Sequence, residues 1–162
     1  MGGDCQQVRI LNTPTALLYK EQWKEGASTE ILPILQMSNT TNKSITKDKV
    51  KDYDIHDRIY SFIVRVIKLV NILPRNASNL VIINQILRSV TSMGANDQEA
   101  DGSLTKKDFI YCYTTVRKEG KETNFWLCLI RDTNPLLEER MDQIIQEGKE
   151  IVAIISTIIN KT

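Results

Sequence analysis

Four polar residues suited to hydrogen bonding recur along one stretch of the chain, LRSVTSMGANDQEADG. They follow one another at spacings of four, four and three residues: Arg88, Ser92, Asn96 and Glu99. Residues at these spacings lie on one side of a helix. Three interpretations are open: a face turned to solvent, a hydrogen-bonded network with a neighbouring helix, or a surface covered by another subunit. In the second, Arg88 would pair with Glu119 or Glu122 of a later helical stretch.

Basic residues form two further groups, whose natural partners are phosphates. The groups are Arg58, Arg65 and Lys68 in one helical stretch, and Arg117, Lys118 and Lys121 in another that begins with Lys106 and Lys107. Acidic residues are interspersed, so ordinary solvated charge is the simpler interpretation. A phosphate-binding surface requires these side chains to meet on one face or to be multiplied around an oligomer.

Residues for acid–base, metal or nucleophilic catalysis are sparse. His56 is the only histidine, and Cys112 and Cys128 have no histidine neighbour in sequence. The chain lacks the Glu-x-x-His pairs of di-iron bundles, a glycine-rich phosphate loop and a nucleophile elbow. We therefore expect no enzyme, no cofactor and no metal. We expect a capping or surface role for His56 and core positions for both cysteines.

Four helices must position these residues. From Asp52 onward, apolar residues recur at gaps of three and four in four stretches, near 55–73, 78–100, 105–130 and 135–158. Pro74 ends the first stretch, and Thr105 with Asp108 resembles a capping box before the third. Asn134-Pro135 supplies a capping residue and a first helical residue for the fourth. The pattern predicts an all-α, antiparallel up-down-up-down four-helix bundle.

Glycines and aromatic residues inside the predicted helices raise packing questions. Gly120 and Gly148 should lie level with Phe62 in an antiparallel bundle, so we expect the Phe62 ring to fill the space that these glycines leave. Phe125 and Trp126 are adjacent and cannot both point into one core. Core packing is the simpler interpretation for this pair, and an oligomer contact is the alternative.

The chain divides into two regions of different character. Residues 1–50 have no sustained period, so we expect an irregular N-terminal extension before a bundle domain at 51–162; a short element docking on the domain is the minor alternative. From Lys51 on, acidic and basic residues are equal in number, which by itself does not indicate a nucleic-acid binder. No signal peptide or membrane-spanning run is evident, which indicates a cytoplasmic protein.

Three stretches carry a family resemblance: YDIHDRIYSFIVRVIKLV, LVIINQILRSVTSMGANDQEADG and SLTKKDFIYCYTTVRKEGKETNFWL. Over about residues 51–161 the chain resembles the bacterial four helix bundle family of 23S ribosomal RNA intervening-sequence proteins. The resemblance implies a bundle that assembles as a ring-like homopentamer and has no enzymatic residues. A related branch comprises accessory variability determinant proteins of diversity-generating retroelements, which bind nucleic acid and a reverse transcriptase.

The resemblance implies structural or intersubunit roles for the opening polar residues. It therefore favours a network that braces them against the third helix or against a neighbouring subunit. The function we expect is that of a non-enzymatic, oligomeric protein that binds ribosomal or other structured RNA. Its phosphate contacts would be Arg58, Arg65, Lys68, Arg117, Lys118 and Lys121. The alternative is a protein-interaction scaffold or an accessory subunit of a reverse transcriptase or another RNA enzyme.

Overall fold

The computed structural model describes residues 54–162, and for residues 138–140 it describes the backbone alone. Four α-helices and one 3-10 helix follow one another: α3 (Ile55–Asn71), α4 (Ala77–Asp101), α5 (Lys106–Thr133), η1 (Pro135–Leu137) and α6 (Glu138–Lys161). This range contains no strand. The predicted extension, residues 1–50, and its boundary with the bundle lie outside the described residues.

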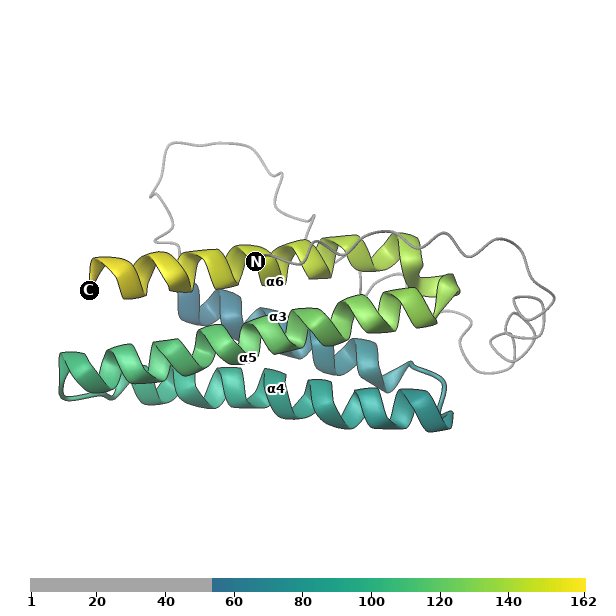
Figure 1. Cartoon of the computed structure of the whole chain (residues 1–162), viewed down its shortest axis with the longest axis horizontal. Helices are drawn as coiled ribbons and strands as arrows, with labels where there is room; N and C mark the ends of the chain where they lie inside the picture. Colours follow the sequence, from purple (N-terminus) through teal and green to yellow (C-terminus); the bar gives the residue numbers. More distant parts are fainter. Residues whose placement is uncertain (1–53) are drawn as a thin grey trace, which may run out of the picture.

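The four helices form a closed up-down bundle. α3 packs against α4 and α6, and α5 packs against the same two helices, so α3 and α5 occupy opposite corners. Figure 1 shows the α4–α5 connection at one end of the bundle and the α3–α4 and α5–α6 connections at the other. The all-α, up-down prediction is confirmed. No helix in the described range is long and apolar enough to cross a membrane.

Short polar side chains begin three of the helices. Asp54 precedes α3 and accepts a hydrogen bond from the backbone N–H of His56, and Asn76 caps α4 in the same way. Thr105 caps α5: its Oγ1 accepts from the backbone N–H of Asp108 at 3.1 Å. Each cap satisfies an N–H that has no partner within its helix. The capping role predicted for Thr105 is confirmed.

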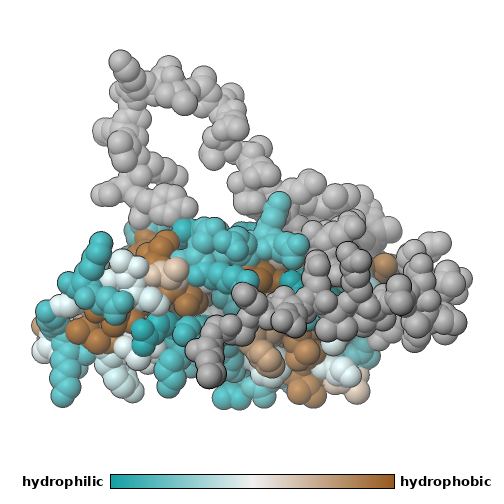
Figure 2. Space-filling model, turned by 45° about the horizontal axis from the view of Figure 1, so that its top comes forward, coloured by the Kyte–Doolittle hydropathy of each residue, from teal (hydrophilic) through white to brown (hydrophobic). Residues whose placement is uncertain are grey.

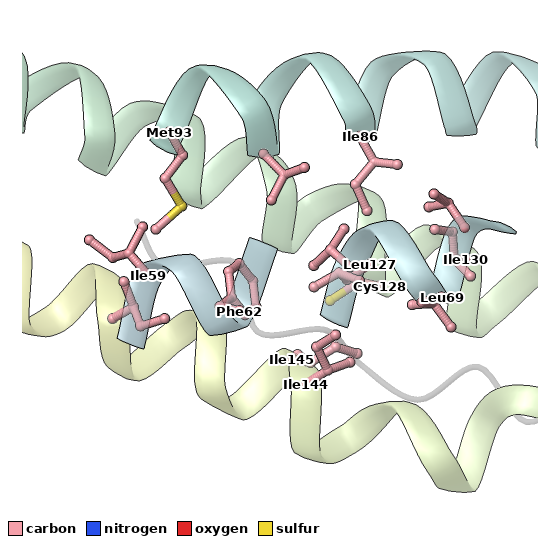
Figure 3. Close-up of a cluster of buried hydrophobic side chains, with 14 of the residues drawn as sticks. Ile59, Phe62, Leu69, Ile86, Met93, Leu127, Cys128, Ile130, Ile144 and Ile145 are labelled. Carbon is pink, nitrogen blue, oxygen red and sulfur yellow. The ribbon is translucent and has the colours of Figure 1, made fainter. Parts of the chain in front are cut away.

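Apolar stripes from all four helices meet along the bundle axis. Figure 3 shows Phe62 of α3 among Ile59, Leu127 and Ile144, each from a stripe with gaps of three and four. These four side chains are at most 1% exposed. The predicted stripes are confirmed in their main members. The spacing also places Leu80 in the stripe of α4, but this side chain is 43% exposed at the first turn of the helix.

Two glycines in the helices do not make room for Phe62, as the sequence led us to expect. A Cβ at Gly120 would lie 2.9 Å from Cγ2 of Val152, and a Cβ at Gly148 would overlap the side-chain amide of Asn124. Both glycines therefore lie where α5 and α6 pack directly on each other. Phe62 is buried elsewhere in the core, so the prediction is wrong because these glycines serve a contact between two other helices.

Asn134 does not cap the fourth helix. It ends α5, and Pro135 starts the short 3-10 helix before α6 begins without a side-chain cap. The buried Asn134 amide instead exchanges hydrogen bonds with Asn79, at 3.1 and 3.4 Å, and Asn79 also donates to the carbonyl of Pro74 at 3.0 Å. This amide pair ties the α3–α4 connection to the α5–α6 connection.

Candidate functional site

A histidine–aspartate pair joins the start of α3 to α4. Nδ1 of His56 lies 2.9 Å from Oδ2 of Asp97, whose side chain is only 2% exposed. The second carboxylate oxygen, Oδ1, is buried without a hydrogen-bond partner. We expected a cap or surface position for His56. Its backbone N–H does bond to the cap Asp54, but its half-buried ring also bonds a buried carboxylate of another helix.

The environment of this pair shifts two pKa values. Burial alone would lower the pKa of His56, but the hydrogen bond to Asp97 and its charge outweigh burial, with Asp54 and Asp101 contributing, and raise it above 6.5. Burial raises the pKa of Tyr113 on α5 to about 12, and the nearby charge of Asp97 adds to the shift. The contact with Asp97 thus favours the protonated form of the His56 ring over what an isolated histidine would show.

Arg58, one of the six predicted phosphate ligands, already has two carboxylate partners. Its Nε donates to Oε1 of Glu147 at 2.6 Å, and its terminal nitrogen donates to Glu147 and Glu150 at 3.0 and 2.5 Å. The Arg58 side chain is 12% exposed. These contacts link α3 to α6 and balance the guanidinium charge, so Arg58 has a structural role here.

The other five predicted basic residues divide between opposite corners of the bundle. Lys68 is exposed and Arg65 half-buried on α3, while Lys118 and Lys121 are exposed and Arg117 is half-buried on α5. Since α3 and α5 do not share a side of the bundle, the structure does not bring the two groups together in one chain.

The basic residues of α5 lie between two exposed aromatic rings. Tyr111 is 72% exposed and Phe125 is 58% exposed. The sequence Tyr111, Lys118, Phe125 advances by seven residues at each step, so the three side chains follow one face of the helix about 10 Å apart. Lys121 lies one turn from both Lys118 and Phe125. From the sequence we grouped these lysines with other basic residues, and we did not place them on one helix face with the aromatic rings.

The opening polar stripe lies on the outside of α4 in a single chain. Arg88 is exposed and donates to Oε1 of Gln85 at 3.2 Å, while Asn96 donates to the backbone oxygen of Ser92 at 2.9 Å. Glu99 is also exposed. The predicted pairing of Arg88 with a glutamate of α5 does not occur within the described chain. Of the two arrangements that we expected, the described chain does not show the first, in which Arg88 pairs with α5, and contact with a neighbouring subunit stays a prediction.

The register between α4 and α5 nevertheless places acidic side chains beside this stripe. A buried hydrogen bond of 2.9 Å joins the hydroxyls of Ser89 and Thr123 and fixes the level of the two antiparallel helices. Arg88 and Glu122 each precede one of these residues, so they lie within one turn of the bond. Glu122 is exposed and accepts a hydrogen bond from the indole of Trp126 at 3.2 Å. Glu119, one turn earlier on α5, is half-buried.

Exposed apolar side chains accompany these polar groups. Figure 2 shows, on the face that it presents, apolar patches between hydrophilic side chains. The large apolar residues with high exposure are Tyr60, Leu80, Val81, Leu104, Tyr111 and Phe125. Phe125 also meets Trp126 edge to face, with ring centroids 4.9 Å apart. Trp126 thus packs partly on the core, as the simpler interpretation of this pair expects. Phe125 points outward, and an oligomer contact stays a prediction for it.

Clusters for metal chemistry are not found in the described part of the chain: no three His, Cys, Asp or Glu side chains gather to hold an ion. Cys112 and Cys128 are both buried, as predicted. Burial raises the pKa of the Cys112 thiol, and the charges of Glu99 and Asp108 add to the shift. A thiol with a raised pKa is a poor nucleophile at neutral pH.

The bundle, its outward polar stripe and the basic face of α5 are all contained in a region that matches a protein family. That family is the 23S rRNA-intervening sequence protein family, and the match covers residues 51–157. The chain belongs to this family. It is also similar to a solved protein of unknown function from the S23 ribosomal protein family of Bacteroides thetaiotaomicron VPI-5482.

The similarity to the solved S23 family protein spans its full bundle. The sequences are 34% identical, the TM-score is 0.60, and the alignment covers 65% of this chain and 98% of the other. A comparison with curated proteins finds no match. Membership in the intervening-sequence family confirms the predicted resemblance, and it does not assign a catalytic or binding residue.

Proposed function

We propose that this intervening-sequence family protein is a non-enzymatic, oligomeric RNA-binding protein that contacts structured ribosomal RNA through the outward face of α5. The observation that carries the proposal is the succession of Tyr111, Lys118, Lys121 and Phe125 along that face. Exposed lysines neutralise phosphates, and exposed aromatic rings accept unstacked bases from loops or bulges. Each base stacked on such a ring contributes about 1–3 kcal/mol.

A single chain offers too small a basic surface for tight binding. Lys118 and Lys121 have carboxylates close by in sequence, and Arg58 is paired with two glutamates. A ring of subunits solves this problem, because repeated weak surfaces on one RNA raise the overall affinity by about 100-fold or more without a new contact. We accordingly propose a homo-oligomer, with the pentamer implied by the family as the expected form.

The polar stripe of α4 is the surface that we propose for contact between subunits. Arg88 and Glu99 are exposed in one chain, and Glu119 and Glu122 lie alongside on α5. A ring is built from contacts in which one patch of a copy meets a different patch of the next copy. Arg88 on α4 and the acidic side chains on α5 would supply two such patches of opposite charge. The arginine would find its carboxylate partner in the neighbouring copy.

The first test of the proposal is binding to a structured fragment of 23S ribosomal RNA across a salt series. Each phosphate neutralised on a single strand adds about 0.7 to the slope of log affinity against log salt. The variant Lys118→Glu with Lys121→Glu should therefore flatten the slope by about 1.4 for each subunit engaged, and weaken binding. Tyr111→Ala and Phe125→Ala should weaken binding without changing the slope.

Lys149 provides the matched control for this series. It is exposed on α6, as is Lys161, and Lys149→Glu together with Lys161→Glu makes the same charge change as the α5 pair, away from the α5 face. Equal losses for the α5 pair and for Lys149→Glu with a second α6 reversal, Lys161→Glu, would mean that binding follows net charge alone. An absence of binding by wild-type protein at low salt would overturn the proposed function.

Arg88→Ala tests the assembly separately. Among residues 54–162 of one chain, the Arg88 side chain bonds only Gln85, at the surface, so its loss should leave the fold intact and reduce the oligomer. Light scattering with size exclusion measures the change, and Arg75→Ala, another exposed arginine, is the control. Unchanged mass for Arg88→Ala would remove this stripe from the subunit contact.

A protein-interaction scaffold, such as an accessory subunit of a reverse transcriptase or another RNA enzyme, is the second candidate. The exposed apolar side chains of α3 and α4, including Tyr60 and Val81, favour it, because such residues are typical of protein contacts. In that case Tyr60→Ala or Val81→Ser would abolish capture of a protein partner, and RNA alone would bind weakly to wild type.

A further inference from the structure

Six side chains form a straight stripe along the outside of α5, which we call the outer stripe. They follow one another at gaps of four, three, four, three and four residues: Lys107, Tyr111, Thr114, Lys118, Lys121 and Phe125. Each of them stands two residues before a member of the core-facing stripe that runs from Phe109 to Leu127. Two residues are about 200° of rotation about a helix axis, so the outer stripe lies opposite the core. All of its members are exposed except Thr114, which is half-buried.

Two exposed aromatic rings lie far apart on the outer stripe. Tyr111 is 72% exposed and Phe125 is 58% exposed. Two heptads separate them, a rise of about 21 Å along the helix. Lys118 and Lys121 stand between the rings, and Lys107 precedes Tyr111 by one turn. A ligand that covers the whole stripe must therefore offer a flat apolar face at two points and negative charge between them.

The lysines of the outer stripe have no carboxylate partner in the described part of the chain. No ion pair there includes Lys107, Lys118 or Lys121. Glu122 lies one turn after Lys118, but its carboxylate accepts a hydrogen bond from the indole of Trp126, at 3.2 Å. Exposed lysines without such partners attract a polyanion, and their charge is complementary to a row of phosphates.

The outer stripe fits an unpaired strand better than a duplex. A duplex carries about one negative charge for each 1.7 Å, or about twelve over the distance between the rings, against three lysines. A stacked single strand carries about half as many. The bases of a duplex also stack on one another, so Tyr111 and Phe125 would meet ribose and phosphate. An unpaired strand can turn a base onto each ring.

Base sequence has little to act on in the outer stripe. The stripe contains no arginine, asparagine or glutamine, whose forked groups bond two atoms of one base edge. Its lysines neutralise phosphates, which every nucleotide has. Its rings stack on any base, because every base has a π face. The stripe therefore selects unpaired RNA and not a particular sequence.

We propose that each outer stripe binds one unpaired RNA segment of about four to seven nucleotides, without preference for its sequence. One base stacks on Tyr111 and another on Phe125, and the phosphates between them lie at Lys118 and Lys121. The upper length follows from a spacing of about 3.4 Å for each stacked base. The lower length is that of the smallest aromatic single-strand sites, about four nucleotides. This inference rests on the proposed function and names the part of a structured RNA that the α5 face binds.

The first experiment measures how the cost of losing one ring depends on the length of the RNA. Diuridylate and heptauridylate compete with a labelled fragment of 23S ribosomal RNA for the intact oligomer. A dinucleotide cannot bridge the two rings, which are alternative sites for it, so Tyr111→Ala and Phe125→Ala should each weaken it only about twofold. Heptauridylate bridges both rings, so each variant should weaken it about fivefold or more. Heptacytidylate should behave as heptauridylate does.

Two comparisons test the chemistry of the contact. A blunt RNA duplex should compete about fivefold or more less well than heptauridylate, although it carries more charge. Phe125→Leu keeps apolar bulk without a flat ring and should lose as much binding as Phe125→Ala, whereas Phe125→Trp should bind as wild type does. Tyr60→Ala is the matched control, since it removes a ring that is 70% exposed from α3, at the opposite corner of the bundle. It should leave binding unchanged.

Three binding results would overturn the inference: equal losses for the two lengths, equal competition by duplex and single strand, or equal binding by Phe125→Leu and Phe125→Trp. A fall in oligomer mass for Phe125→Ala, measured by light scattering, would also overturn it, because the ring would then belong to a contact between copies. In each of these cases, binding of the ribosomal fragment by wild type keeps the proposed function, and only the choice of an unpaired segment fails. If wild type does not bind the fragment at low salt, both fail.

Discussion

Replacing His56 by alanine removes the side chain that bonds Oδ2 of the buried Asp97. Asp97 has its Oδ2 bonded to His56 at 2.9 Å and its Oδ1 without a partner. In the variant, the Asp97 carboxylate loses the His56 ring as its partner. It must then remain charged without that partner, take up a proton, or draw in water. Each outcome costs stability, and none restores the link between α3 and α4.

The size of the effect follows from burial. Breaking a fully buried ion pair by removing one partner costs about 3–5 kcal/mol. The His56 side chain is 31% exposed, so water relieves part of this cost, and we expect His56→Ala to lose about 2 kcal/mol. That is a large share of the roughly 5–15 kcal/mol that stabilises a typical domain. It corresponds to a fall in Tm of about 8 °C or more.

The loss should depend on pH in a definite direction. The pKa of His56 is raised above its ordinary value of 6.5, so its charge contributes fully to stability below pH 6.5. The contribution is lost as pH rises through the raised pKa of the folded state. Urea denaturation from pH 6 to pH 9 should therefore show wild type losing stability, and His56→Ala losing less over the same range.

Two further variants separate charge from hydrogen bonding. His56→Gln keeps a hydrogen-bond donor but has no titrating charge. It should therefore recover part of the stability that His56→Ala loses, and its stability should depend on pH no more than that of His56→Ala. Asp97→Asn leaves the half-buried histidine without its carboxylate, so NMR should find the pKa of His56 below its wild-type value. Parallel curves of stability against pH for wild type and His56→Ala would refute this account of the pair.

Three other contacts lead to predictions. Asn134→Ala removes the side-chain partner of the buried Asn79 and should cost about 1–3 kcal/mol, measured by urea denaturation with the exposed Asn84→Ala as control. Gly148→Ala forces the Asn124 amide aside and should destabilise, whereas the double variant with Asn124→Ala should recover that loss and gain up to about 1 kcal/mol of helix propensity. The hydrogen bond from Arg58 lowers the pKa of Glu150 below its ordinary value of 4.5. This contact therefore stabilises the fold above pH 4.5, and its contribution is lost as the pH falls through the lowered pKa. Arg58→Met should show a smaller loss of stability than wild type as the pH falls below 4.5.

Regular features of the fold were predictable because they depend on local sequence. Gaps of three and four placed Phe62, Val116 and Ile144 in the core, and Thr105 marked the start of α5. Asn134-Pro135 misled us about the fourth helix. The local pattern matches a helix start, but a buried partner 55 residues away determines where the Asn134 side chain lies.

The polar contacts between helices could not be predicted from spacing. His56 and Asp97 are 41 residues apart, and Arg58 and Glu147 are 89 apart, so neither pair has a periodic signal. Arg88 had a plausible glutamate on the next helix at the correct level. Arg88 does not pair with this glutamate in one chain because the rotation of α4 about its own axis turns the Arg88 side chain outward.

Polar side chains of the bundle thus fall into two sets with different meanings for function. His56, Arg58 and Asn134 find their partners within the chain, between helices that neighbour each other, and they hold the fold. The stripe through Arg88 and the α5 face through Lys118 remain exposed, although side chains of the correct charge and level lie beside them. Since the chain satisfies the first set and leaves the second open, the structure directs the search for function to contacts beyond one subunit. The contacts that we propose are with a neighbouring copy at α4 and with RNA at α5.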